Sequence, residues 1–181
     1  MEAQKEISSR ADAVWLIDPV HTSIEFSIKN FFFFTVKGRL TQISGTVVLD
    51  DKDIRRSAVE AAIKAASIET GNKRRDEHLR SPDFLEIERY PDISFQSTKV
   101  EPGRDRDTLV ITGQLTIKAT SREVVLDVTE VDRSRSPQGE EVAYYTALTE
   151  IDRFDFGINY GRVMTGRKLK ITIHVQAIKR R

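Results

Sequence analysis

The sequence lacks cysteine altogether. This absence excludes disulfide bonds, iron–sulfur clusters, thiol redox chemistry and cysteine-ligated zinc. Charge of one sign is not in excess either, because 29 Lys and Arg stand against 28 Asp and Glu and the formal net charge is +1. A general nucleic-acid-binding protein normally carries surplus cations that neutralise phosphates, so we expect no nucleic-acid partner.

Long apolar runs are also missing. The most apolar run, residues 31–34 with Val36 beyond it, is far shorter than the roughly 20 residues that span a bilayer. The first residues, MEAQKEISSRADA, are charged and lack the apolar core of a secretory signal. We therefore expect no integral membrane segment and a cytoplasmic location.

What the sequence has instead is a period of two in its apolar residues. Ile24, Phe26 and Ile28 alternate with polar residues, and the same alternation runs through residues 109–117 and 169–175. This period is typical of β-strands that bury one face. With 181 residues, of which 39% are apolar, the chain fits a single domain with a core.

Polar turns, such as residues 101–105, separate the alternating segments. About eight such segments in one domain favour an antiparallel barrel or a sandwich, and a barrel leaves no strand edge exposed. We expect this mainly β domain to cover residues 14–178 and to follow a flexible tail over residues 1–13.

One segment breaks the period of two. Asn72 can cap a helix over residues 73–80, and Ser81 can cap a second short helix over residues 83–88. The sequence therefore predicts a short helical insert near residues 72–88, between two strands.

Small residues on the apolar faces mark places where space could remain inside a barrel. Ala61, Ala65 and Gly113 lie on predicted inner faces. In an eight-stranded barrel such positions either leave a cavity for one slender ligand or receive large neighbours, such as Phe26 and Phe95, in a close-packed core. The pattern alone favours close packing.

Four consecutive phenylalanines occupy residues 31–34. Strand alternation would place two rings inside the barrel and two outside, where the outer pair would pack against the helices or a partner. An irregular loop at the barrel mouth is the alternative. The run predicts either ligand contacts through Phe32 and Phe34 or a contact between two copies of the chain.

The helical insert is dense in charge. Arg75, His78 or Arg80 could meet an anionic headgroup at the end of an apolar pocket, because guanidinium groups match phosphate oxygens. Surface pairing between residues four apart is the alternative. His78 could also act as a general base oriented by Asp76 or Asp83, which is the basis of an enzymatic alternative.

Other signs of catalysis are few. The three histidines are scattered along the chain, so no zinc site is predicted, and no serine stands in a nucleophile elbow. Asp152 and Asp155 beside Arg153 predict a structural corner of ion pairs.

Several segments together resemble the YceI-like family, whose members are lipocalin-like polyisoprenoid-binding proteins. The resemblance covers nearly the whole chain, from Trp15 to near Ala177. Its motifs are Trp15-x-Ile17-Asp18-Pro19-x-His21-x-Ser23, Gly71-Asn72-x-x-Arg75-Asp76-x-His78-Leu79-Arg80-Ser81-x-Asp83-Phe84, Tyr90-Pro91-x-Ile93-x-Phe95, Gly113-x-Leu115-Thr116-Ile117 and Arg153-x-Asp155-Phe156-Gly157.

The resemblance implies an antiparallel eight-stranded lipocalin-like barrel with helices packed beside it and a long apolar cavity for an isoprenoid-type lipid. It further implies that such lipids are carried or stored without a known reaction. The recurring His and Asp positions of the family correspond here to His21, His78 and Asp83.

The functional hypothesis is that the barrel binds a long-chain amphipathic lipid, such as a polyisoprenoid or an isoprenoid quinone, for transport or storage. No cofactor and no metal are predicted, and the second partner is another copy of the chain in a homodimer. The alternatives are a hydrolase or metal-dependent enzyme that uses His78, and a packed barrel that acts as a dimeric interaction module. The candidate ligand-binding residues are Ile24, Phe26, Ile28, Phe32, Phe34, Ile63, Phe95, Ile111, Leu115, Ile173, Arg75 and His78.

Overall fold

The computed structural model of this protein describes residues 13–181, so the tail expected over residues 1–13 lies outside the described residues, apart from Ala13. Ala13 itself begins the first strand. No helix in the described part of the chain is long and apolar enough to cross a membrane. The strands are β1 (Ala13–Ile17), β2 (Ser23–Asn30), β3 (Phe34–Leu40), β4 (Ile43–Leu49), β5 (Ala58–Lys64), β6 (Ile68–Glu69), β7 (Asp92–Pro102), β8 (Thr108–Ile117), β9 (Thr120–Arg135), β10 (Glu141–Asp152) and β11 (Thr165–Lys179). The helices are α2 (Lys73–Arg80) and the 3₁₀ turns η1 (Ile54–Arg56), η2 (Ala65–Ser67) and η3 (Arg153–Phe156).

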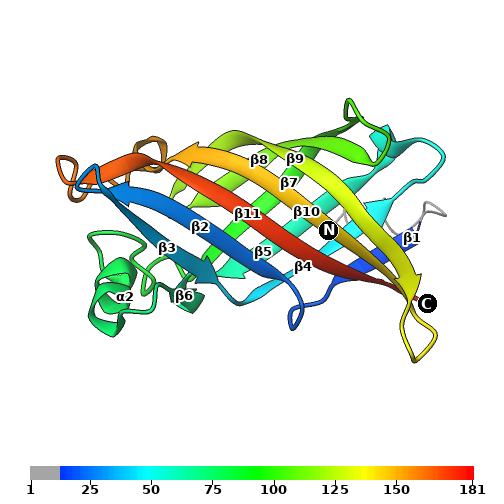
Figure 1. The fold of residues 1–181 in the computed structure, drawn as a ribbon, viewed down its shortest axis with the longest axis horizontal. Coiled ribbons are helices and arrows are strands. Elements are labelled where there is room, and N and C mark those ends of the chain that lie inside the picture. The colour runs from blue at the N-terminus through cyan, green and yellow to red at the C-terminus, as the bar shows by residue number, and fades with distance from the viewer. Residues whose placement is uncertain (1–12) are drawn as a thin grey trace.

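The strands form one closed antiparallel barrel, elongated along its axis (Figure 1). Each strand pairs with the next around the ring from β4 through β5, β7, β8, β9 and β10 to β11, and β1 closes the ring by pairing with both β4 and β11. Closure satisfies the backbone hydrogen bonds that an open sheet would leave at its edges.

The barrel has eight strands although eleven are named, because three of the eight are each divided into two segments. β1 and β2 follow one another along β11, where Ile17 lies opposite Ala177 and Ser23 opposite His174. β3 and β4 continue each other in the same way, and η2 links β5 to β6. The prediction of an eight-stranded antiparallel barrel is therefore confirmed.

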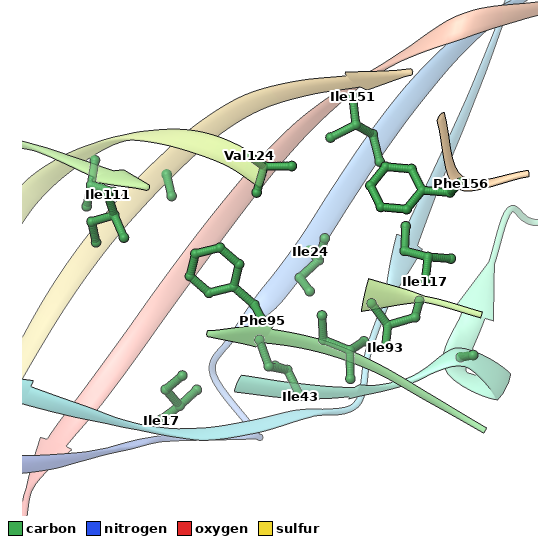
Figure 2. Close-up of a cluster of buried hydrophobic side chains, with 14 of the residues drawn as sticks. Ile17, Ile24, Ile43, Ile93, Phe95, Ile111, Ile117, Val124, Ile151 and Phe156 are labelled. Carbon is green, nitrogen blue, oxygen red and sulfur yellow. The ribbon is translucent and has the colours of Figure 1, made fainter. Parts of the chain in front are cut away.

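The core lies inside the barrel because the apolar residues of each strand share the inner face. In β2 the register places Ile24, Phe26 and Ile28 on one side, and Ile24 is fully buried. Inward-pointing side chains from several strands meet along the axis, as Figure 2 shows for Ile24 and Phe95. Their burial provides most of the free energy that stabilises such a fold.

The two ends of the barrel differ, and we name them here. The tip end carries the turn between β2 and β3, the loop of residues 157–164 that follows η3, and the insert with α2 (Figure 1). The far end carries the loops after β4, β7 and β9 and the end of β11.

The helical insert contains one helix in place of the two expected. The Asn72 side chain caps α2 by accepting a hydrogen bond from the Arg75 N–H at 3.0 Å, as predicted. The second helix, over residues 83–88, does not form. There the N–H groups of Leu85 and Ile87 turn back to carbonyls of the last turn of α2, and Glu86 has a positive φ of 50°. The N–H groups of Phe84 and Glu86 both bond to the Ser81 carbonyl, so the segment forms successive turns in place of a helix.

Candidate functional site

The barrel encloses an apolar cavity of about 300 Å³. All strands of the barrel, together with α2 and the loops beside it, contribute to its wall. The lining side chains are aliphatic or phenyl groups apart from five, which are Ser57, Tyr145, Thr149, Arg153 and Thr165. Such a wall suits a hydrocarbon, because almost every contact that it offers is apolar.

The structure places eight of the twelve candidate residues on the wall of this cavity. They are Ile24, Phe26, Ile28, Ile63, Phe95, Ile111, Leu115 and Ile173. The other four, Phe32, Phe34, Arg75 and His78, lie outside it. A role in ligand binding remains a prediction for all twelve.

The small residues do not leave space in the way that the alternation indicates. The Phe95 ring lies so close over Gly113 that a Cβ there would collide with it, and the Phe26 ring lies over Gly38 in the same way. Ala65 is buried in η2, away from the cavity wall, whereas Ala61 lines the wall. Phenyl rings therefore fill the space above both glycines, and the cavity lies between the inward-facing side chains.

Arg153 is a buried cation that the sequence analysis assigned to an ion-pair corner, and this assignment is wrong. Its guanidinium donates hydrogen bonds of 2.7–3.1 Å to the backbone carbonyls of Ile158, Tyr160, Thr165 and Gly166. Burial lowers the pKa of Arg153. Asp152 instead accepts a hydrogen bond from Arg167 at 2.6 Å. Arg153 therefore holds the loop of residues 157–164 to the end of the barrel.

Tyr145 is a residue of the cavity wall that the alternation of side chains did not mark. Its side chain lines the wall near the far end, packed with Trp15 and Leu49. The hydroxyl is fully covered and has no hydrogen-bond partner among residues 13–181. Burial, reinforced by the nearby Glu130 carboxylate, raises the pKa of Tyr145, so the phenol keeps its proton. Because protein atoms cover the hydroxyl, a molecule in the cavity has no access to it in this structure.

His78 pairs with Asp83, one of the two carboxylates expected as its partner. The distance from His78 Nε2 to Asp83 Oδ2 is 2.8 Å, and the imidazole lies edge-on to the rings of Phe84 and Tyr160. Asp76, the other candidate, instead accepts hydrogen bonds from the backbone and side chain of Thr70. The His78–Asp83 pair thus joins α2 to the segment that follows it and to the loop at the tip end.

The other two histidines lie elsewhere. His21 contacts Asp18 at 2.7 Å, and the exposed His174 lies 3.9 Å from Glu25. Among residues 13–181 no three His, Asp or Glu side chains gather as metal ligands would.

The arginines of α2 bond to the chain that precedes the helix. Arg75 donates to the hydroxyl and the carbonyl of Thr70 at 2.7 and 2.8 Å, and Arg80 donates to the carbonyls of Ala66 and Ile68. Surface pairing between Asp76 and Arg80, one of the two alternatives, is replaced by these bonds. Leu79, Phe84 and Leu85 meanwhile reach the cavity wall, so the insert closes one side of the barrel.

The four phenylalanines do not divide into an inner and an outer pair. Because Asn30 lies opposite Phe34 in the register, residues 31–33 form a short connection at the end of the barrel. All four side chains are exposed, and those of Phe32 and Phe33 are 84% and 87% accessible. The alternative of a loop at the barrel mouth is therefore confirmed, and the division into inner and outer rings is wrong, because the turn carries the rings beyond the end of the sheet.

Comparisons with known proteins agree with this architecture. Protein YceI of Escherichia coli O157:H7 is 29% identical, with 89% of this chain and 83% of that protein covered. A UPF0312 protein of Vibrio campbellii is 27% identical, with coverage of 96% and 90%.

Solved structures share the fold. BcnA of Burkholderia cenocepacia has a TM-score of 0.79 at 19% identity, covering 88% of this chain and 98% of that one. The YCEI protein of Campylobacter jejuni scores 0.71 at 27% identity, with 84% and 90% covered. A polyisoprenoid binding domain from Saccharophagus degradans scores 0.71 at 12% identity, with 93% and 99% covered. The YceI-like domain model matches residues 15–177, and the chain therefore belongs to the YceI-like family.

Proposed function

We propose that this protein binds a long-chain amphipathic lipid, such as a polyisoprenoid or an isoprenoid quinone, with the apolar tail inside the barrel. The observation that carries the proposal is the cavity of about 300 Å³ with its almost wholly apolar wall. The similar domain from Saccharophagus degradans, described as polyisoprenoid binding, supports the same ligand class.

The energetics favour a long ligand over a small one. Burial of one methylene group stabilises a complex by about 0.8 kcal/mol, whereas association costs roughly 4–15 kcal/mol. Micromolar affinity requires about 8 kcal/mol net, which corresponds to roughly 15–30 buried carbons. The volume of the cavity lies at the lower end of the range for ligand sites. The binding affinity therefore depends on how many ligand carbons the cavity encloses.

Tyr145 offers an amphipathic ligand one polar contact, provided that the wall opens beside it. Its covered hydroxyl is a donor without a partner among the described residues. A lipid oxygen that displaced the covering side chains would supply the missing hydrogen bond. A protein of this kind holds its lipid away from water, and we propose that it does so for transport or storage.

The first test is to purify the protein, extract it with organic solvent and identify bound lipid by mass spectrometry. Uptake of a fluorescent long-chain fatty acid measures the same cavity in solution. We expect affinity to rise about fourfold for each added methylene until the cavity is full. Absence of bound lipid, together with absence of uptake, would contradict the proposal.

A matched pair of variants on β2 locates the binding. Ile28→Asp places a carboxylate on the cavity wall, and Ser27→Asp places the same group at the next position, on the other face of the strand. We expect Ile28→Asp to abolish uptake and Ser27→Asp to retain it. Circular dichroism checks that both variants fold, and Ile28→Trp, which fills the cavity without a charge, replaces Ile28→Asp if that variant unfolds.

A further inference from the structure

One surface at the tip end is apolar, and nothing among residues 13–181 covers it. We name it the tip patch, and it consists of residues 31–34, Val163 and Met164. The two loops form a single surface, because the Phe31 N–H donates a hydrogen bond to the Met164 carbonyl at 2.6 Å. Val163 is 84% accessible, close to the values for Phe32 and Phe33. Contiguous exposed apolar surface of this kind marks an interaction site.

The fold itself does not call for phenylalanine in this turn. Phe31 and Phe32 have φ angles of 50° and 65°, a region that glycine or asparagine enters far more readily than a bulky residue. The Phe32 ring gains little burial in return, because it is 84% accessible. The residue choice at this turn therefore has a reason outside the barrel.

The tip patch lies on segments that are rich in cations. The two segments that build it, residues 29–37 and 157–168, contain no Asp or Glu. Their five cationic residues are Lys29, Lys37, Arg162, Arg167 and Lys168. Arg167 is paired with Asp152, and the other four have no carboxylate partner within the described part of the chain. Arg162 is held in place over the Phe154 ring, with its guanidinium carbon 5.0 Å from the ring centroid.

We propose that the tip patch docks this protein on the surface of a bilayer that contains anionic lipids. The phenyl rings would enter the boundary between headgroups and acyl chains, where aromatic side chains are favoured, and the cations beside them would face the lipid phosphates. A second copy of the same surface is the poorer occupant, because it would bring like charges together. A turn that projects at the end of the barrel also suits insertion better than a flat contact (Figure 1).

The position of the tip patch relates docking to the cavity. Ile28 and Thr165 line the cavity, and the Thr165 hydroxyl bonds to the side chain of Asn30, the residue before the first phenylalanine. A docked bilayer would therefore lie against the end of the cavity wall. Docking itself does not depend on what the cavity binds.

The experiment is flotation of the full-length protein with vesicles of phosphatidylcholine, with and without phosphatidylglycerol. We expect binding to the anionic vesicles that weakens as salt is added. The double variant Phe32→Ser, Phe33→Ser should lower partitioning about tenfold for each ring removed. Val20→Ser is the matched control, because Val20 is 81% exposed in the turn between β1 and β2, and it should bind as the wild type does.

The role of charge is tested with a double variant, Lys37→Glu and Arg162→Glu. It should lose most of the preference for vesicles that contain phosphatidylglycerol. Absence of vesicle binding by the wild type, or equal binding by the phenylalanine variant, would overturn the proposal. Measuring the molecular mass of the same proteins in solution tests the competing occupant, a second copy of the chain. A dimer that the double serine variant converts to a monomer, without vesicle binding, would show that the surface joins two copies and that the proposal is wrong.

Discussion

The two ends of the barrel differ in the burial of their aromatic residues and in the ion pairing of their cations. At the far end, Trp15 is 2% exposed and lies beneath Arg133, which itself bonds to Asp51 and Glu130. At the tip end, the phenyl rings of residues 31–34 lie in solvent, and among the described residues only Arg167 of the five nearby cations pairs with a carboxylate.

The contrast shows that exposure at the tip end is not a general property of the chain. The same sequence covers its single tryptophan with a cation and pairs that cation with carboxylates. The chain itself covers the aromatic ring at the far end, whereas we propose that a bilayer covers the rings at the tip end. Variants at matching positions should separate stability at one end from binding at the other.

The largest expected effect is at the far end. Trp15→Ala removes a buried ring that packs with Leu49, Ala143 and Ala177, and it should lower the free energy of unfolding by about 3–5 kcal/mol. Phe33→Ala should change the same quantity by less than about 0.5 kcal/mol, since the ring is exposed. Urea denaturation measures both. Equal effects would remove the distinction between the ends.

Arg153 tests whether the tip end also contains a structural centre. Arg153→Ala leaves four backbone carbonyls without their donor, and we expect a loss of about 3 kcal/mol in the free energy of unfolding. Arg162→Ala, the exposed neighbour, should lose less than about 1 kcal/mol. Urea denaturation of the two variants decides the comparison, and a small effect of Arg153→Ala would show that the loop of residues 157–164 is held by other contacts.

A smaller effect is expected in the middle of the barrel. Gly113→Ala places a methyl group where the Phe95 ring lies, so the ring must move and the variant should lose about 1–3 kcal/mol of stability. Because Phe95 lines the cavity, uptake of the fatty-acid probe should change as well. Thermal unfolding and probe titration measure the two quantities. A variant with unchanged stability would mean that the ring has room to shift.

The smallest expected effect concerns the lipid. Tyr145→Phe removes one hydrogen-bond donor and should weaken binding of an isoprenoid alcohol by about 1 kcal/mol, or roughly fivefold. Binding of a plain hydrocarbon of the same length should not change. Competition with the fluorescent probe gives both affinities. An equal loss for the two ligands would assign a packing role to Tyr145.

Alternation of side chains made the barrel predictable, because it is a local property of each strand. Ile24, Phe26 and Ile28 could be assigned to the inner face from their spacing alone, and the structure places all three on the cavity wall. The capping role of Asn72 could be predicted as well, because a cap bonds to a residue within three positions. The turn at residues 31–33 was not, because a strand pattern does not reveal where pairing ends.

The parts that the sequence did not reveal depend on distant or backbone partners. Arg153 bonds to carbonyls, which every residue has, so no side-chain pattern marks it. Tyr145 lies in a strand with weak alternation, and its unpaired hydroxyl is a property of the whole wall. His78 meets Asp83 five residues later, because the chain leaves the helix in between and returns.

The way the barrel closes also bears on how the protein is made. β11 pairs with β10 on one side and with β1 and β2 on the other, so it closes the ring between the two ends of the sheet. A nascent chain on the ribosome has no enclosed interior until residues 165–179 emerge, and until then its apolar faces remain open to water and to other chains. Synthesis of the final strand is thus the step at which an open sheet with an exposed apolar face can close into a barrel.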